Sequence, residues 1–212
     1  MSTNEEILTR FAEFLGQESY QDYHSNFGRV MKILQGELKI AEGIEAGSLA
    51  MGFKIRNSGD LDVIFTYVQT EKTAPNIRSE LFTVLSSSLE NQAEVTLDDP
   101  ETSRSVKIIF ENEIEMDIVY KDYTSYEREK RMIDHFDNLP DYILHIVRLV
   151  KYAEINYSNN KIKKHSIHKI SSTIQGNSFI KKLRNTIHRS GGGQVQDIID
   201  YLIREANRFD IN

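Results

Sequence analysis

Two stretches of the chain decide its fold: GSLAMGFKIRNSGDLD at residues 47–62 and IEMDIV at residues 114–119. The first stretch passes through a loop rich in glycine and small residues. It runs into residues 61–68, which are rich in β-branched and aromatic residues and are therefore predicted to form a strand. Asp60 and Asp62 stand at the start of that predicted strand. Because side chains alternate along a strand, both carboxylates are expected to point to the same face.

A third carboxylate, Asp117, lies in the second stretch, where residues 106–120 are expected to form a β-hairpin with its turn at 111–113. If its strand lies beside the first one, three carboxylates meet, and like charges repel one another. Divalent cations prefer such oxygen ligands and can stabilise both the attacking and the leaving oxygen of a displacement at phosphorus. Asp60, Asp62 and Asp117 are therefore the predicted catalytic residues and the predicted ligands of Mg²⁺, with Mn²⁺ as an alternative.

Gly47 and Ser48 stand upstream of the first two aspartates, at a transition from helix to loop. Small residues let the backbone approach a triphosphate, and the Ser48 hydroxyl can bond a phosphate oxygen. Lys54 and Arg56, in the same loop, could contact phosphate or simply be solvated. A Gly-Ser pair alone is commonly a turn, and Asp-x-Asp alone is commonly a strand cap. Together, and followed by the third acid, they predict a metal-dependent site for a nucleoside triphosphate.

This combination resembles the active-site signature of the DNA polymerase beta nucleotidyltransferase superfamily. Within it, the chain is most similar to the group that contains cyclic GMP-AMP synthase, the bacterial cyclic-oligonucleotide synthases and oligoadenylate synthase. The archaeal CCA-adding enzymes share these features. The resemblance covers about residues 20–175. It implies that Lys151, in YILHIVRLVKYAEI, binds phosphate from a helix, and that Ser166, in KHSIHK, begins a helix and contacts the terminal phosphates.

The resemblance implies template-independent transfer of a nucleoside monophosphate from an NTP to a nucleotide or RNA hydroxyl, with release of pyrophosphate. The product would be a cyclic or linear signalling oligonucleotide. An alternative is addition of nucleotides to an RNA 3′ end, as in CCA-, poly(A)- and uridylyltransferases. Adenylylation of a partner protein and an inactive regulator are further alternatives. The chain departs from the group in a smaller helical lobe and in Ala153, where an aromatic residue is common. These departures leave the acceptor and the product open.

The order of elements indicates an α+β fold, in which a mixed sheet flanked by helices precedes a small helical lobe. We expect a catalytic lobe with N-terminal helices over residues 1–125 and a C-terminal helical lobe over residues 126–212. Apolar positions recur at helical spacing between residues 17 and 45, which predicts one long helix or two abutting helices there. Further helices are predicted at residues 5–15, 77–91, 126–136, 140–157, 166–174, 178–188 and 194–209.

The charges of the chain are distributed unevenly. The 212 residues carry a net charge of −6, yet residues 148–189 contain ten lysines and arginines and a single acid, Glu154. Such a segment is commonly a solvated face, but it also fits a polyanion, so nucleic acid is an expected partner beside the NTP. The absence of cysteine excludes disulfides and thiolate metal sites. No secretory signal or membrane-spanning run is seen, so we expect a cytoplasmic protein without a membrane partner and leave its oligomeric state open.

Overall fold

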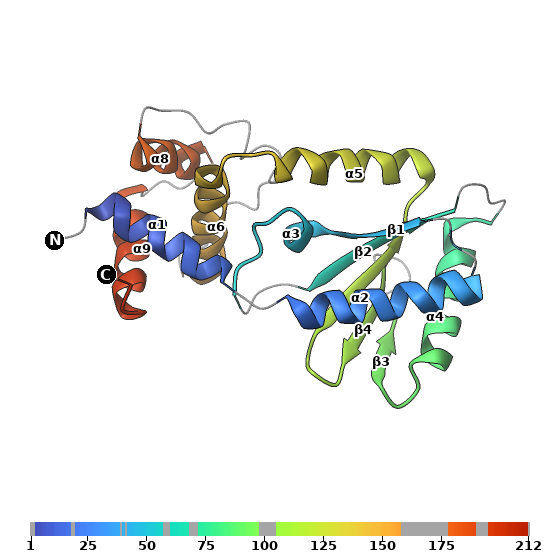
Figure 1. The fold of residues 1–212 in the computed structure, drawn as a ribbon. Helices are drawn as coiled ribbons and strands as arrows, with labels where there is room; N and C mark the ends of the chain where they lie inside the picture. Colours follow the sequence, from blue (N-terminus) through green and yellow to red (C-terminus); the bar gives the residue numbers. More distant parts are fainter. Residues whose placement is uncertain are drawn as a thin grey trace. The chain divides into compact units, whose positions relative to one another are not determined.

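The structure is a computed structural model, and it divides into two compact units. A sheet unit comprises Ser19–Gly52 and Ser58–Asn138, and a helical unit comprises Met1–Glu18, Phe53–Asn57 and Leu139–Asn212. Within these units the structure describes residues 3–17, 20–38, 40, 42–56, 60–67, 72–97, 105–157, 178–189 and 195–211. A mixed sheet flanked by helices confirms the expected α+β class (Figure 1).

The sheet has five strands in the order β1-β2-β5-β4-β3. Only the central pair, β2 and β5, is parallel, and the other neighbours are antiparallel. The parallel pairing places the strand that carries Asp117 directly beside the strand that begins after Asp60, which is the condition on which the expected meeting of the three carboxylates depended. The strands are β1 (Glu42–Ala46), β2 (Leu61–Thr66), β3 (Ala93–Thr96), β4 (Ser105–Phe110) and β5 (Glu115–Tyr120).

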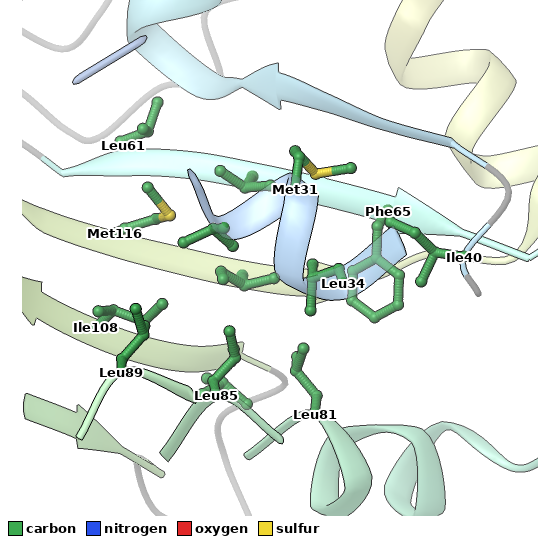
Figure 2. Close-up of a cluster of buried hydrophobic side chains, with 14 of the residues drawn as sticks. Met31, Leu34, Ile40, Leu61, Phe65, Leu81, Leu85, Leu89, Ile108 and Met116 are labelled. Carbon is green, nitrogen blue, oxygen red and sulfur yellow. The ribbon is translucent and has the colours of Figure 1, made fainter. Parts of the chain in front are cut away.

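One face of the sheet is covered by α2 (Gln21–Ile33), the π-helical segment η1 (Leu34–Leu38) and α4 (Ala74–Ser88). Figure 2 shows the large apolar cluster that they form with the strands. Met31 and Leu34 come from α2 and η1, and Leu85 comes from α4. The opposite face carries a smaller apolar cluster that includes Ile64 and Tyr126. There α5 (Tyr123–Asp137) packs on β1 and β2.

The prediction of helix across residues 17–45 was wrong at its end, because Glu42–Ala46 is the strand β1. This segment contains a glycine, an alanine and two glutamates, which are residues of low strand propensity, so its pairing with β2 could not be read locally. The packing of α2 on β1 leaves no room for a side chain at Gly43. A Cβ at this position would collide with the side chain of Met31, so α2 packs directly against the strand backbone.

The helical unit consists of α1 (Asn4–Gly16), α6 (Asp141–Asn156), α8 (Phe179–Arg189), α9 (Val195–Arg208) and the short segment Phe53–Asn57. The N-terminal helix α1 packs on α6 and α9. The Tyr152 hydroxyl donates a hydrogen bond to Glu205 at 2.9 Å, and Phe11 meets the Tyr152 ring edge-on at 5.1 Å between centroids. This division differs from the boundary at residue 125 that the sequence suggested, since α1 joins the C-terminal helices and α5 joins the sheet. No helix in the described part of the chain combines the length and apolarity needed to cross a membrane.

Candidate metal and nucleotide site

A row of side chains crosses the whole sheet on the face that α5 partly covers. The strand registers pair Ala46 with Asp62, Asp62 with Asp117, Asp117 with Lys107, and Lys107 with Thr96. Directly paired residues share a face, so these five side chains form one line, here called the central row. Asp62 and Asp117 therefore occupy the middle of the sheet, at neighbouring positions on its parallel strands.

Asp60 completes a cluster with these two aspartates. One carboxylate oxygen from each of Asp60, Asp62 and Asp117 lies within 4.8 Å of the others, and all three residues are partly buried. Leu61 and Val63 are fully buried on the opposite face of the same strand. The strand alternation thus directs the acids to one side and the apolar residues to the other, as expected. The structure brings together the three carboxylates that the sequence singled out.

The three carboxylates crowd one another, and the pKa of Asp117 reports this crowding. Burial raises the pKa of Asp117 to about 7, and its hydrogen bond with Asp60 and the charge of Asp60 act in the same direction, while Lys107 opposes them. The Oδ1 atom of Asp117 is buried and has no hydrogen-bond partner among the described residues. Buried carboxylate oxygens normally have a partner. Carboxylates are the donors that hard divalent cations prefer, so this set fits a metal ion.

Gly47 lies against Asp62, at the start of the short helix α3 (Gly47–Ala50). Its φ is +64°, which favours glycine, and a Cβ at this position would lie 2.6 Å from the Asp62 Cγ atom. The Met51 amide donates to the Gly47 carbonyl at 3.1 Å and closes the turn. Only a residue without a side chain fits here. The Gly47-Ser48 peptide is consequently held next to the carboxylate cluster.

The other predicted nucleotide-binding residues come from the C-terminal part of the chain. Lys151 lies on α6 in the helical unit, where its ammonium is 5.7 Å from the centroid of the Phe53 ring. Ser166 and the helix predicted at residues 166–174 lie outside the described residues.

The basic residues of segment 148–189 that the structure describes differ in their exposure to solvent. Arg148 is partly buried, and a Cβ at Gly16 would collide with its guanidinium, so Arg148 packs against α1 and does not belong to an open basic face. On α8, by contrast, Lys181, Arg184 and Arg189 are exposed. The candidate polyanion surface within the described residues therefore lies on α8.

Two lysines have surroundings that were not anticipated. Lys54, expected in a loop open to phosphate or solvent, is 1% exposed within the helical unit. Lys107 was not singled out, yet it is the cross-strand partner of Asp117 and its ammonium lies 3.1 Å from Oε2 of Glu115. The hairpin register could have identified Lys107, because a turn centred on Asn112 places residues 107 and 117 opposite each other.

No family model and no curated protein sequence matches the chain. Solved structures do. The structure of CdnC from E. coli MS115-1 with ATP superposes with a TM-score of 0.65 at 20% identity, over 87% of this chain and 70% of that one. The GLD-2/RNP-8 complex gives a TM-score of 0.61 at 13% identity, over 81% and 54%. The Cid1 poly(U) polymerase bound to Mg 3′-dATP gives a TM-score of 0.55 at 17% identity, over 73% of this chain and 48% of that one.

These three neighbours are polymerase beta-like nucleotidyltransferases. The likeness in three dimensions, despite low sequence identity, shows that the chain has the polymerase beta-like nucleotidyltransferase fold. This confirms the fold that the Gly-Ser and Asp-x-Asp pattern implied. The chain spans about half the length of the GLD-2 and Cid1 chains and more than two thirds of CdnC.

Proposed function

We propose that the chain is a metal-dependent nucleotidyltransferase that moves a nucleoside monophosphate from an NTP to a hydroxyl group and releases pyrophosphate. The observation that carries this proposal is the carboxylate cluster on a nucleotidyltransferase fold, in which oxygens of three aspartates lie within 4.8 Å of one another. The Oδ1 atom of Asp117 is buried and has no hydrogen-bond partner in the described part of the chain. This supports the proposal that a cation binds there. Mg²⁺, when bound, would stabilise the charge that develops on the attacking and leaving oxygens.

Each aspartate has a proposed part in the displacement. Asp60 and Asp62 would bind both metal ions, and Asp117 would bind the catalytic one and help to remove the proton of the attacking hydroxyl. The acceptor oxygen forms a bond to the α-phosphorus. The bond between that phosphorus and the oxygen bridging to the β-phosphate breaks, and the electron pair leaves with pyrophosphate.

The triphosphate is proposed to lie over Gly47 and Ser48. Gly47 brings its backbone against Asp62 with no side chain in between, so phosphate oxygens can reach both the peptide and the cations held by the carboxylates. The Ser48 hydroxyl then bonds a phosphate oxygen. Lys151 is proposed to bind phosphate, and Ser166, which lies outside the described residues, is proposed to contact the terminal phosphates. For these two residues the support is the resemblance of their segments to the family.

The product is proposed to be a cyclic or linear oligonucleotide made from free NTPs, and addition to an RNA 3′ end is the second candidate. The exposed basic residues of α8 favour keeping this second candidate, because Lys181, Arg184 and Arg189 could hold the backbone of a nucleic acid. Nucleic acid would then be the acceptor or an activator. Neither possibility depends on the sequence of the nucleic acid, since phosphate contacts carry little base information.

The direct test is incubation of the purified protein with each α-labelled NTP and Mg²⁺ or Mn²⁺, with and without RNA or double-stranded nucleic acid. Short labelled products formed from NTPs alone support the oligonucleotide product, and extension of the added RNA supports 3′-end addition. Label on the protein itself or on a protein partner would instead indicate protein adenylylation. No labelled product under any of these conditions would contradict the proposed activity.

A further inference from the structure

The central row orders the parts of the site across the sheet. Gly47 follows β1, Asp62 lies on β2, Asp117 on β5, and Lys107 on β4. Neighbouring strands lie about 4.8 Å apart. Lys107 is therefore one strand beyond Asp117, on the side away from Gly47-Ser48. It is the cation of the central row and stands next to the acidic cluster.

The surroundings of Lys107 leave its ammonium available to a second anion. Its side chain is 24% exposed, and it bonds Glu115, whose side chain is 49% exposed. Ion pairs between partly exposed side chains contribute little stability, so a bound anion could displace Glu115 from the ammonium. Lys107 is also the direct cross-strand partner of Asp117, so its side chain lies beside the cluster.

We propose that Lys107 binds the phosphate of a nucleotide acceptor while the sugar hydroxyl of that acceptor attacks beside Asp117. This inference rests on the proposed function. In an in-line displacement the acceptor approaches from the side opposite the leaving pyrophosphate. With the triphosphate over Gly47-Ser48, that side is the one formed by β5 and β4. A sugar hydroxyl and the 5′-phosphate of the same nucleotide are separated by one sugar ring, comparable with the strand spacing between Asp117 and Lys107.

The acceptor class follows from this position. It is a hydroxyl that belongs to a phosphorylated nucleotide, either a free nucleotide or the terminal nucleotide of an RNA, and not the hydroxyl of a protein side chain. Both sources present the same chemistry to Lys107, namely a phosphate on the sugar that carries the attacking oxygen.

The test compares acceptors that differ only in that phosphate. Transfer from a saturating labelled NTP is measured to a nucleoside, to its 5′-monophosphate and to a short oligoribonucleotide. Lys107→Gln should raise the acceptor KM about tenfold for the two phosphate-bearing acceptors. The KM of the nucleoside and that of the donor NTP should stay unchanged, and Lys107→Arg should keep most of the wild-type affinity. Lys72→Gln, which removes a similar Lys–Glu pair next to α4, is the matched control.

Glu115→Gln separates a binding role from a structural one. If Lys107 serves the acceptor, Glu115→Gln frees the ammonium, and the acceptor KM falls or stays the same. If the pair only supports the hairpin, both variants weaken activity alike. Equal effects of the two variants, or a change in the donor KM alone, would overturn the inference. A response to the monophosphate but not to the oligoribonucleotide would identify free nucleotides as the acceptors, and the reverse result would identify RNA.

Equilibrium binding keeps this inference separate from the proposed function. Calorimetric titration of a nucleoside monophosphate is performed with Mg²⁺ and an excess of an NTP analogue whose α,β bridge cannot be cleaved. About tenfold weaker binding by Lys107→Gln, without a change in its thermal unfolding, supports the acceptor site. Wild-type protein that binds in this way but transfers nothing would overturn the proposed function alone. Equal binding by wild type and Lys107→Gln would overturn the role of Lys107 alone.

Discussion

Asp62 and Asp117 are directly paired across the two parallel strands at the centre of the sheet. Two carboxylates at such neighbouring positions repel each other, and like charges directly opposite each other destabilise a sheet. Asp60 adds a third carboxylate within 4.8 Å. The protein therefore has an unfavourable arrangement of negative charges at the centre of its sheet. Bound cations would neutralise these charges.

The metal-free protein should lose stability as the pH rises from about 4 to about 7. Asp117 has a folded-state pKa of about 7, above its usual value of 3.8, so the folded state binds more protons than the unfolded state in this window. The stabilisation is complete below the lower value and disappears as the pH passes the higher one. Because the carboxylate is partly exposed, we expect a change of about 1–2 kcal/mol, measured by urea unfolding in the presence of a chelator.

Asp117→Asn is the control for this pH effect. The variant cannot ionise at this position, so it should match wild type near pH 4 and be more stable than wild type near pH 8. Added Mg²⁺ should stabilise wild type near pH 8 and have little effect on the variant. If wild type and Asp117→Asn show parallel stability profiles over the whole range, Asp117 does not have the shifted pKa.

Gly47→Ala should disable the site while leaving the rest of the fold in place. The positive φ costs a residue with a side chain about 1–2 kcal/mol, and the new Cβ would displace the Asp62 carboxylate. We expect weaker Mg²⁺ binding, measured by calorimetry, and loss of nucleotide incorporation. Gly28→Ala on α2 is the matched control, because a Cβ there meets nothing within 4 Å and alanine favours a helix. Normal Mg²⁺ binding by Gly47→Ala would show that Gly47 does not set the position of Asp62.

Ser48→Ala and Lys151→Ala should each raise the KM for the NTP more than they lower the rate at saturation. Both residues are assigned to the triphosphate, so most of the lost interaction is present before and during the transition state. Loss of a charge-assisted contact from Lys151 is expected to raise the KM for the NTP about tenfold. Lys130→Ala, which removes a lysine paired with Glu42, is the control in steady-state kinetics. An unchanged KM in Lys151→Ala would remove this lysine from the phosphate site.

The exposed basic face of α8 should bind nucleic acid in a salt-dependent and sequence-tolerant manner. The logarithm of the affinity should fall linearly with the logarithm of the salt concentration, with a slope of nearly one per phosphate neutralised. The double variant Lys181→Glu/Arg189→Glu should weaken binding and reduce that slope, whereas Lys72→Glu should not. Fluorescence titrations of short RNA and DNA at several salt concentrations measure both quantities. No binding at low salt would leave this face as solvated surface.

The parts of the structure that follow from local pattern could be predicted from the sequence. Alternation along β2 placed Asp60 and Asp62 on one face, and the hairpin of β4 and β5 carried Asp117 to its place. The strand β1 was missed because its residues have weak strand propensity and its pairing with β2 is a tertiary contact. The packing of α1 on α6 and α9 joins residues far apart in the chain, and hydrophobic periodicity does not report such contacts.

Nucleotide incorporation by Asp62→Asn and Asp117→Asn tests the central claim most directly. Each substitution keeps the size of the side chain but removes one carboxylate from the cluster, so the cations lose a ligand and the charge that binds them. At matched Mg²⁺ concentration we expect each variant to incorporate labelled NTP at least about a hundredfold more slowly than wild type, with thermal unfolding showing an intact fold. Incorporation by both variants at the wild-type rate would contradict a metal-dependent site formed by Asp60, Asp62 and Asp117.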